Sequence, residues 1–130
     1  TGALIILARS SELKFFAATG IPIEGELSSK LLETIFNKKS PMHDGAVIVV
    51  KNIIKAASCI LPITDRDMPD DFGLRHRAAV GITEQTDALA IIISEESGTI
   101  SVASKGEVHA HLPEEELSQI LYQEYFEVKV

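Results

Sequence analysis

The hydrophobic positions of this chain fall into short apolar runs that are separated by polar segments. The runs are rich in Val, Ile, Leu and Ala, and they have the length of buried strands. We therefore predict strands at 3–8, 46–50, 53–63, 88–94 and 100–104. The dipeptide Lys51-Asn52 predicts a turn between the second and third of these strands.

Helical signals alternate with the strands. Ser28 or Ser29 is a predicted N-cap, and the helix after it has apolar residues at i, i+3 and i+4 spacing. This apolar face comprises Leu31, Leu32, Ile35 and Phe36. Ser10 and Ser11 offer a cap for a shorter helix that runs through Phe16. Residues 20–22, Gly-Ile-Pro, are predicted to break the chain after it.

The second half of the chain predicts a loop and two further helices. Residues 64–73 are rich in Asp, Pro and Gly, as loops are. Residues 75–86 predict a helix, although Gly81 weakens its propensity. Pro113 and the three glutamates after it predict a last helix, because both suit a first turn. Strands alternating with helices predict a single α/β domain over residues 1–130, a mixed central β-sheet flanked by helices.

Composition narrows the class of protein. A chain of 130 residues can bury one core, and 45% hydrophobic with 24% charged residues is typical of a globular protein. The formal net charge of -7 argues against general nucleic-acid binding. Cys59 is the only cysteine, which excludes an internal disulfide and a Cys-rich zinc site. It lies in an apolar run and is predicted to be buried.

A basic triplet, Arg75-His76-Arg77, stands out in this acidic chain. Guanidinium groups present forked donors that suit phosphate oxygens, and their charge does not titrate near neutrality. A helix that begins near Leu74 would add free backbone N–H groups for an anion. The alternative is a helix start whose arginines form solvent-exposed salt bridges. We favour a site for a small polyphosphate.

A second candidate site precedes the strand at 46–50. His43 and Asp44 are possible metal ligands, and carboxylate oxygens suit Mg²⁺ or Mn²⁺ bound together with substrate phosphates. Asp44-Gly45 alone is a weak signal, because this dipeptide is common in turns. His109 and His111 alternate at period two, but they have no evident third ligand and are expected to be exposed strand residues.

Both candidate sites lie in longer motifs that resemble those of the diadenylate cyclase domain. The motifs are Pro41-Met42-His43-Asp44-Gly45-Ala46-Val47 and Leu74-Arg75-His76-Arg77-Ala78-Ala79-Val80-Gly81. Further resemblance lies in Gly2-Ala3-Leu4-Ile5, Cys59-Ile60-Leu61-Pro62 and Ser94-Glu95-Glu96-Ser97-Gly98. The similarity extends to about Glu124 and is greatest to the membrane-anchored branch of the family, the CdaA type. Leu74 is a departure, since many relatives have Thr there.

The resemblance implies a role for each matching residue. The predicted catalytic residues are Asp44, which acts on the attacking 3′-hydroxyl, and Arg75, His76 and Arg77, which hold the ATP phosphates. The predicted nucleotide-binding residues are Gly45, Ala46, Leu61, Leu74, Arg75, His76, Arg77, Ala78, Ser94 and Glu95. The predicted metal ligands are His43, Asp44 and Glu96, although the sequence does not decide which of Glu95 and Glu96 faces the site.

The activity implied is the condensation of two ATP molecules into cyclic di-3′,5′-adenylate (cyclic di-AMP) with release of two pyrophosphates, aided by Mg²⁺ or Mn²⁺. Because the product is two-fold symmetric, a face-to-face homodimer is expected. Alternatives are a nucleotide-binding regulatory module without turnover and a metal-dependent phosphohydrolase. The chain begins at Thr1 rather than Met. We therefore expect a cytoplasmic piece of a longer protein, anchored in the membrane only through flanking segments.

Overall fold

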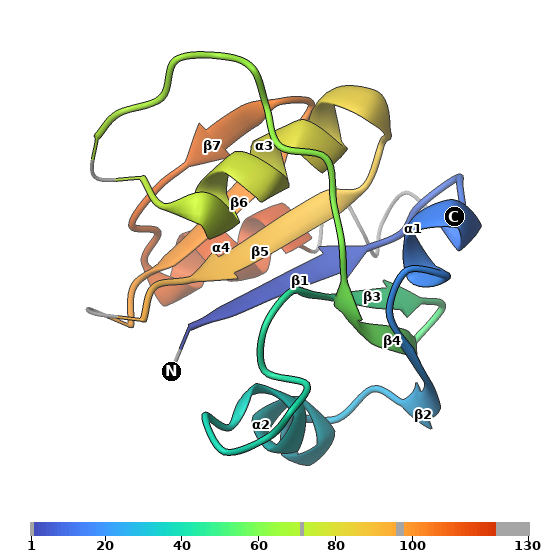
Figure 1. Ribbon diagram of the computed structural model, residues 1–130. Coiled ribbons are helices and arrows are strands. Elements are labelled where there is room, and N and C mark those ends of the chain that lie inside the picture. Colours follow the sequence, from blue (N-terminus) through green and yellow to red (C-terminus); the bar gives the residue numbers. More distant parts are fainter. Residues whose placement is uncertain (1, 71, 96–97, 122–130) are drawn as a thin grey trace.

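The computed structural model describes residues 2–70, 72–95 and 98–121, and it contains one mixed sheet with helices on both faces (Figure 1). The strands are β1 (Ala3–Leu7), β2 (Ile21–Glu26), β3 (Ala46–Val50), β4 (Ile53–Cys59), β5 (Leu89–Ile93), β6 (Ile100–Ser104) and β7 (Glu107–His109). The helices are α1 (Lys14–Ala17), α2 (Ser29–Phe36), α3 (Leu74–Gln85) and α4 (Glu114–Leu121). The strand order across the sheet is β2-β4-β3-β1-β5-β6-β7.

The centre of the sheet is β1, which pairs in parallel with β3 and antiparallel with β5. All residues of β1 and β3 are buried. Leu4 and Ile6 belong to the core cluster that includes residues of α3, whereas Ile5 and Leu7 belong to the cluster that includes residues of α2. Because both faces of the strands are covered, the sequence shows continuous apolar runs here rather than alternation.

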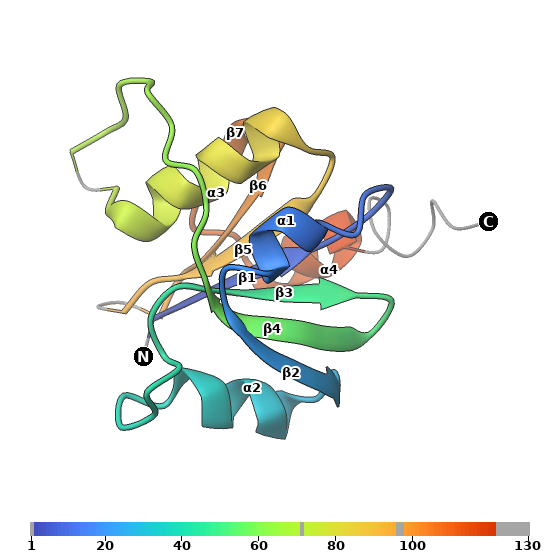
Figure 2. The ribbon, with the colours of Figure 1, turned by 45° about the vertical axis from the view of Figure 1, so that its right-hand side comes forward.

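The helices form two layers around the sheet. Helices α1 and α3 lie over one face, and α2 and α4 over the other, as the two views show (Figures 1 and 2). Ala79 and Ile82 of α3 are fully buried, as is Ile35 of α2. Gly81 allows α3 to lie directly against the backbone of Pro62, where a side chain would collide with the carbonyl group.

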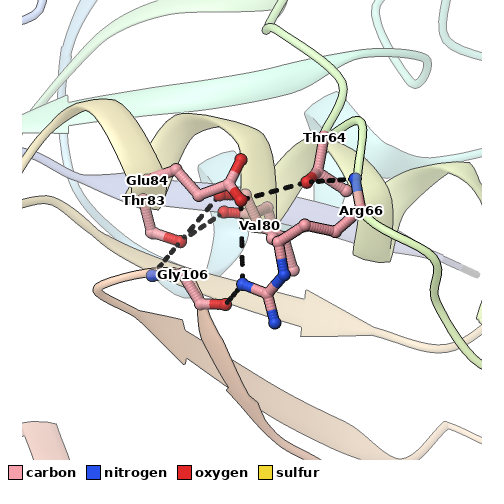
Figure 3. Close-up of polar contacts among 7 residues, drawn as sticks. Thr64, Arg66, Val80, Thr83, Glu84 and Gly106 are labelled. Atoms are coloured by element: carbon pink, nitrogen blue, oxygen red, sulfur yellow. Dashed lines mark hydrogen bonds and ion pairs between the residues drawn. The ribbon is translucent and has the colours of Figure 1, made fainter.

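A polar network fixes the start of the long loop that leads into α3 (Figure 3). Thr64 Oγ1 donates to Glu84 Oε2 (3.1 Å), and Arg66 Nη1 donates to the carbonyl of Gly106 (2.9 Å). Arg66 Nη1 is also 3.7 Å from Glu84 Oε2, and the buried Thr83 hydroxyl accepts from the Gly106 N–H (3.2 Å). The network joins this loop to the last turn of α3 and to the β6–β7 turn.

Most predicted elements are confirmed, and Ser28 is the N-cap of α2, accepting from the Leu31 N–H. Three predictions were wrong in detail. Neither Ser10 nor Ser11 caps α1, which begins later, after Leu13 in a left-handed conformation. Of the predicted break at 20–22, only Gly20 lies outside a regular element, because Ile21 and Pro22 begin β2, an edge strand paired with β4. Strand β4 ends at Cys59, so residues 60–63 continue towards the loop without regular secondary structure.

Candidate active site

A cavity of about 610 Å³ opens where several element ends meet. It is lined by the start of β1, the segment that enters β3, the end of β4 with the residues after it, the start of α3 and the end of β5. Because β1 and β3 run against β4 and β5, two strand starts and two strand ends meet at one edge of the sheet, on the left of Figure 2. The fold thus gathers motifs that lie far apart in the sequence.

Asp44 and Gly45 occupy one side of this cavity. The Asp44 side chain is 85% exposed, so its carboxylate is open to a ligand. Gly45 has a φ of 81°, a left-handed conformation that suits glycine, and a Cβ there would lie 2.8 Å from the carbonyl carbon of Ser58. Ser58 itself has a φ of 56°, at an irregularity in the β3–β4 pairing. This bulge, together with the absence of a side chain at Gly45, sets the position of the Asp44 backbone.

His43 lies beside Asp44 but is not among the residues that line the cavity. Its Nδ1 is 2.8 Å from the carbonyl oxygen of Ser40, and its Nε2 is 3.4 Å from Asp44 Oδ1. A nitrogen that faces a carbonyl must carry the proton, which leaves Nε2 of the neutral ring with a lone pair. Metal-binding histidines are commonly oriented in this way, through a carbonyl behind the other nitrogen.

Arg75 also lines the cavity, together with Glu95, which follows β5 on the other side of β1 from β3. Arg75 Nη1 lies 3.9 Å from Glu95 Oε1, and Lys38 Nζ lies 3.6 Å from Glu95 Oε2. Both contacts are longer than hydrogen bonds and involve partly exposed side chains, so they orient charge more than they stabilise the fold. The guanidinium donors of Arg75 are therefore not committed to Glu95.

The N-terminus of α3 faces the same cavity. Gly73 is its N-cap and makes no side-chain capping bond, so the first-turn N–H groups carry the positive end of the helix dipole towards the cavity. His76 lines the cavity and stacks on Phe72, with ring centroids 4.4 Å apart and an interplanar angle of 13°. The start of α3 thus gives the cavity a positively polarised rim, which is suited to an anion, in a chain with a formal net charge of -7.

The rest of the wall is apolar and includes large exposed side chains. Ile60 and Leu74 are each 70% exposed, and Ile63 is 46% exposed. All three line the cavity. Leu74 was predicted as a site residue, whereas Ile60 and Ile63 were predicted only as part of a strand at 53–63. Their exposure arises because β4 ends before them.

The predicted site residues are largely brought together. Those that line the cavity are Asp44, Gly45, Ala46, Leu61, Leu74, Arg75, His76, Ala78, Ser94 and Glu95. Arg77 is not among the lining residues, and its carbonyl accepts from the Thr64 N–H. Glu96 lies outside the described residues. The lining residues that sequence reasoning did not name as site residues are Leu4, Cys59, Ile60, Ile63, Gly73, Ile92 and Ile93.

Cys59 is buried, as predicted, and burial raises the pKa of its thiol from 9.0 to about 11. Because the thiolate is the reactive form, we expect slow alkylation at neutral pH, with a rate that rises about tenfold per pH unit between pH 7.5 and 9.5. Labelling followed by mass spectrometry measures this, with free N-acetylcysteine as the reference. A rate that levels off below pH 9 contradicts the raised pKa, and Cys59→Ser controls for labelling at other residues.

Two features are absent from the described part of the chain. No group of three or more His, Cys, Asp or Glu side chains within residues 2–70, 72–95 and 98–121 is placed to hold a metal ion. In the same residues, no helix is both long and apolar enough to span a membrane. His109 and His111 are exposed and do not line the cavity; His109 ends β7 and His111 follows it in a left-handed conformation.

Fold and cavity together define an α/β domain whose largely apolar pocket has basic side chains and a helix N-terminus at its rim, an arrangement common in ligand-binding sites. The profile of the family described as "DisA bacterial checkpoint controller nucleotide-binding" matches residues 1–108. The chain therefore belongs to this family, that of the diadenylate cyclase domain.

Individual relatives agree with the family assignment. The chain is 46% identical to the cyclic di-AMP synthase CdaA of Bacillus subtilis, over 95% of this chain and 46% of that protein. It is 45% identical to a diadenylate cyclase of Listeria monocytogenes, over 95% of this chain and 45% of the relative. The chain thus spans about half the length of these curated relatives.

Solved structures confirm the expected fold class. The crystal structure of a double mutant of DacA from Staphylococcus aureus matches with a TM-score of 0.92 and 38% identity, over 96% of this chain and 84% of that one. A hypothetical membrane-spanning protein from Bacillus cereus matches with a TM-score of 0.81 and 41% identity, over 86% of this chain and 55% of that one.

Proposed function

We propose that this domain condenses two ATP molecules into cyclic di-AMP and releases two pyrophosphates. The observation that carries the proposal is the cavity itself, which has an exposed carboxylate, Asp44, on one side and Arg75, His76 and the start of α3 on the other. The reaction needs a 3′-hydroxyl in line with an α-phosphorus and neutralisation of charge on the leaving pyrophosphate. The two sides of the cavity match these two needs.

Asp44 accepts the proton of the attacking 3′-hydroxyl, or orients that hydroxyl, in this proposal. Arg75, His76 and the first-turn N–H groups of α3 bind the phosphate oxygens and stabilise the leaving pyrophosphate. Leu61 and the apolar wall around it exclude water and hold the base. Arg77 follows these residues in the chain but does not line the cavity. In this proposal its positive charge acts on the phosphates only at long range.

The donor set fits a Mg²⁺ or Mn²⁺ ion that takes most of its ligands from phosphates and water. Two ligands about 2.1 Å from one ion lie about 3 Å apart, close to the 3.4 Å between His43 Nε2 and Asp44 Oδ1. Asp44 and His43 would hold the ion, with Glu96 as a further predicted ligand. When bound, the ion supplies electrostatic stabilisation to the phosphates and lowers the pKa of the attacking hydroxyl.

A two-fold symmetric product further requires two nucleotides, whereas a cavity of about 610 Å³ has the size of a single ligand site. We therefore propose that two domains meet face to face, each presenting its ATP to the other. Ile60, Ile63 and Leu74, exposed at the cavity, are the kind of apolar surface that a partner covers.

Dimer-dependent activity has a simple kinetic consequence. We expect the rate to rise more steeply than first order in protein concentration when the domain is dilute, because weak dimers dissociate by mass action. A dilution series with light scattering on the same samples tests this. Constant specific activity from a protein shown to be monomeric contradicts the face-to-face arrangement.

The two alternatives are separated by the nucleotide that is formed on incubation with ATP and Mn²⁺ or Mg²⁺. Cyclic dinucleotide with pyrophosphate supports the proposed reaction. ADP or AMP without a dinucleotide supports a phosphohydrolase that uses His43, Asp44 and Glu95. Unchanged ATP supports a binding module.

A further inference from the structure

Arg75 reaches the cavity by lying over the backbone of Gly2, the residue directly before β1. A Cβ atom built on Gly2 would lie 2.5 Å from Arg75 Nη1, 2.8 Å from Cζ and 3.2 Å from Nη2. All three guanidinium atoms thus lie closer to this Cβ position than the 3.4–4 Å of an ordinary van der Waals contact. The guanidinium fills the space that a side chain at position 2 would occupy.

Within the residues that the structure describes, the ion pair of Arg75 holds it only weakly. Its pair with Glu95 spans 3.9 Å, and Glu95 is 53% exposed and shared with Lys38. A partly exposed ion pair of this length contributes little to holding a side chain in one geometry. The absence of a side chain at Gly2 is therefore a steric condition for the observed position of the guanidinium.

We propose that Gly2 is a positioning residue for the ATP site: by having no side chain, it lets Arg75 lie where its donors reach the phosphates. The inference rests on the proposed role of Arg75 as a phosphate ligand. A methyl group at position 2 would displace the guanidinium from this position. Losing its charge-assisted bonds to phosphate is expected to weaken ATP binding about 10- to 100-fold. Because only the end of a flexible side chain must move, the fold itself should tolerate the change.

The direct test is Gly2→Ala, with the dissociation constants of ATP and adenosine measured by calorimetry. We expect ATP binding to weaken about 10- to 100-fold and adenosine binding to change less than twofold, with the melting temperature within about 3 °C of the unmodified chain. Gly25→Ala is the matched control. Its added Cβ also meets a flexible side-chain end, Leu31 Cδ2 at 2.9 Å, but it lies in β2, away from the cavity. This control should bind both ligands normally.

A double-variant cycle shows whether Gly2 acts through Arg75. In an Arg75→Ala background the guanidinium is gone, so Gly2→Ala should cause no further loss of ATP affinity. An equal loss in both backgrounds, equal losses for ATP and adenosine, or unchanged ATP binding in Gly2→Ala would each overturn the proposal. Failure of Gly2→Ala to fold would also overturn it, because the proposal requires that the Arg75 guanidinium can move aside without disturbing the fold.

These readouts are independent of turnover. A protein that binds ATP through Arg75 yet forms no cyclic dinucleotide would overturn the proposed reaction and leave the positioning role of Gly2 to be judged by binding alone. Loss of turnover in Gly2→Ala with unchanged ATP affinity would instead overturn the positioning role while leaving the reaction in place.

Discussion

Replacing Asp44 with Asn is expected to lower the rate of cyclic dinucleotide formation by about 10²- to 10⁴-fold while ATP binding changes less than about threefold. The amide keeps the shape of the carboxylate but cannot accept the hydroxyl proton or attract a cation. The side chain is 85% exposed, so no buried network is broken and the fold should be unaffected. Product formation and ATP affinity, measured on the same preparation, check this result.

Asp67→Asn is the matched control, because Asp67 is an exposed aspartate of the loop that leads into α3 and does not line the cavity. It should retain the full rate. Turnover of Asp44→Asn at the level of the unmodified chain would remove Asp44 from its proposed role. A parallel loss of ATP binding would make it a binding residue rather than a catalytic one.

The second large effect is expected from the arginines. Replacing Arg75 and Arg77 together with Ala should weaken ATP binding about 10- to 100-fold and adenosine binding less than twofold, because the lost contacts are charge-assisted bonds to phosphate. Arg75 lines the cavity and Arg77 does not, so Arg75→Ala alone should account for most of the loss. Calorimetric titration of the single and double variants with both ligands measures each contribution.

The control for this series is Arg9→Ala, which removes an arginine that does not line the cavity. It should leave both affinities unchanged. Equal losses for ATP and adenosine in the Arg75→Ala protein would mean that the basic triplet supports the fold rather than the phosphates. A larger loss from Arg77→Ala than from Arg75→Ala would contradict the placement of the two side chains.

The sequence predicted the centre of the fold well, because buried strands and amphipathic helices depend on local patterns. The continuous apolar runs at β1 and β3 indicated strands covered on both faces, and the spacing in α2 indicated one buried helical face. The edge strand β2 was missed. It contains Pro22 and Gly25, both unfavourable in strands, and it exists because β4 offers it a hydrogen-bonding partner.

Only those residues of the site that lie within one continuous sequence motif could be predicted. Asp44 and Arg75 were found because contiguous motifs surround them, and the structure places both at one cavity. The contact between Gly2 and Arg75 joins two parts of the chain that are far apart, and no local pattern indicates it. Ile60 was predicted to lie in a strand, because nothing in the apolar sequence around it shows that β4 ends at Cys59.

The most direct test of the proposed reaction is its stoichiometry in a single vessel. The protein is incubated with ATP and Mn²⁺ or Mg²⁺, and ATP, cyclic dinucleotide and pyrophosphate are quantified together over time, with the Asp44→Asn protein run in parallel. We expect two ATP consumed and two pyrophosphates released for each cyclic di-AMP formed, and almost none of this in the variant. Consumption of ATP to ADP and phosphate, or to AMP and pyrophosphate with no cyclic dinucleotide, would contradict the proposed function.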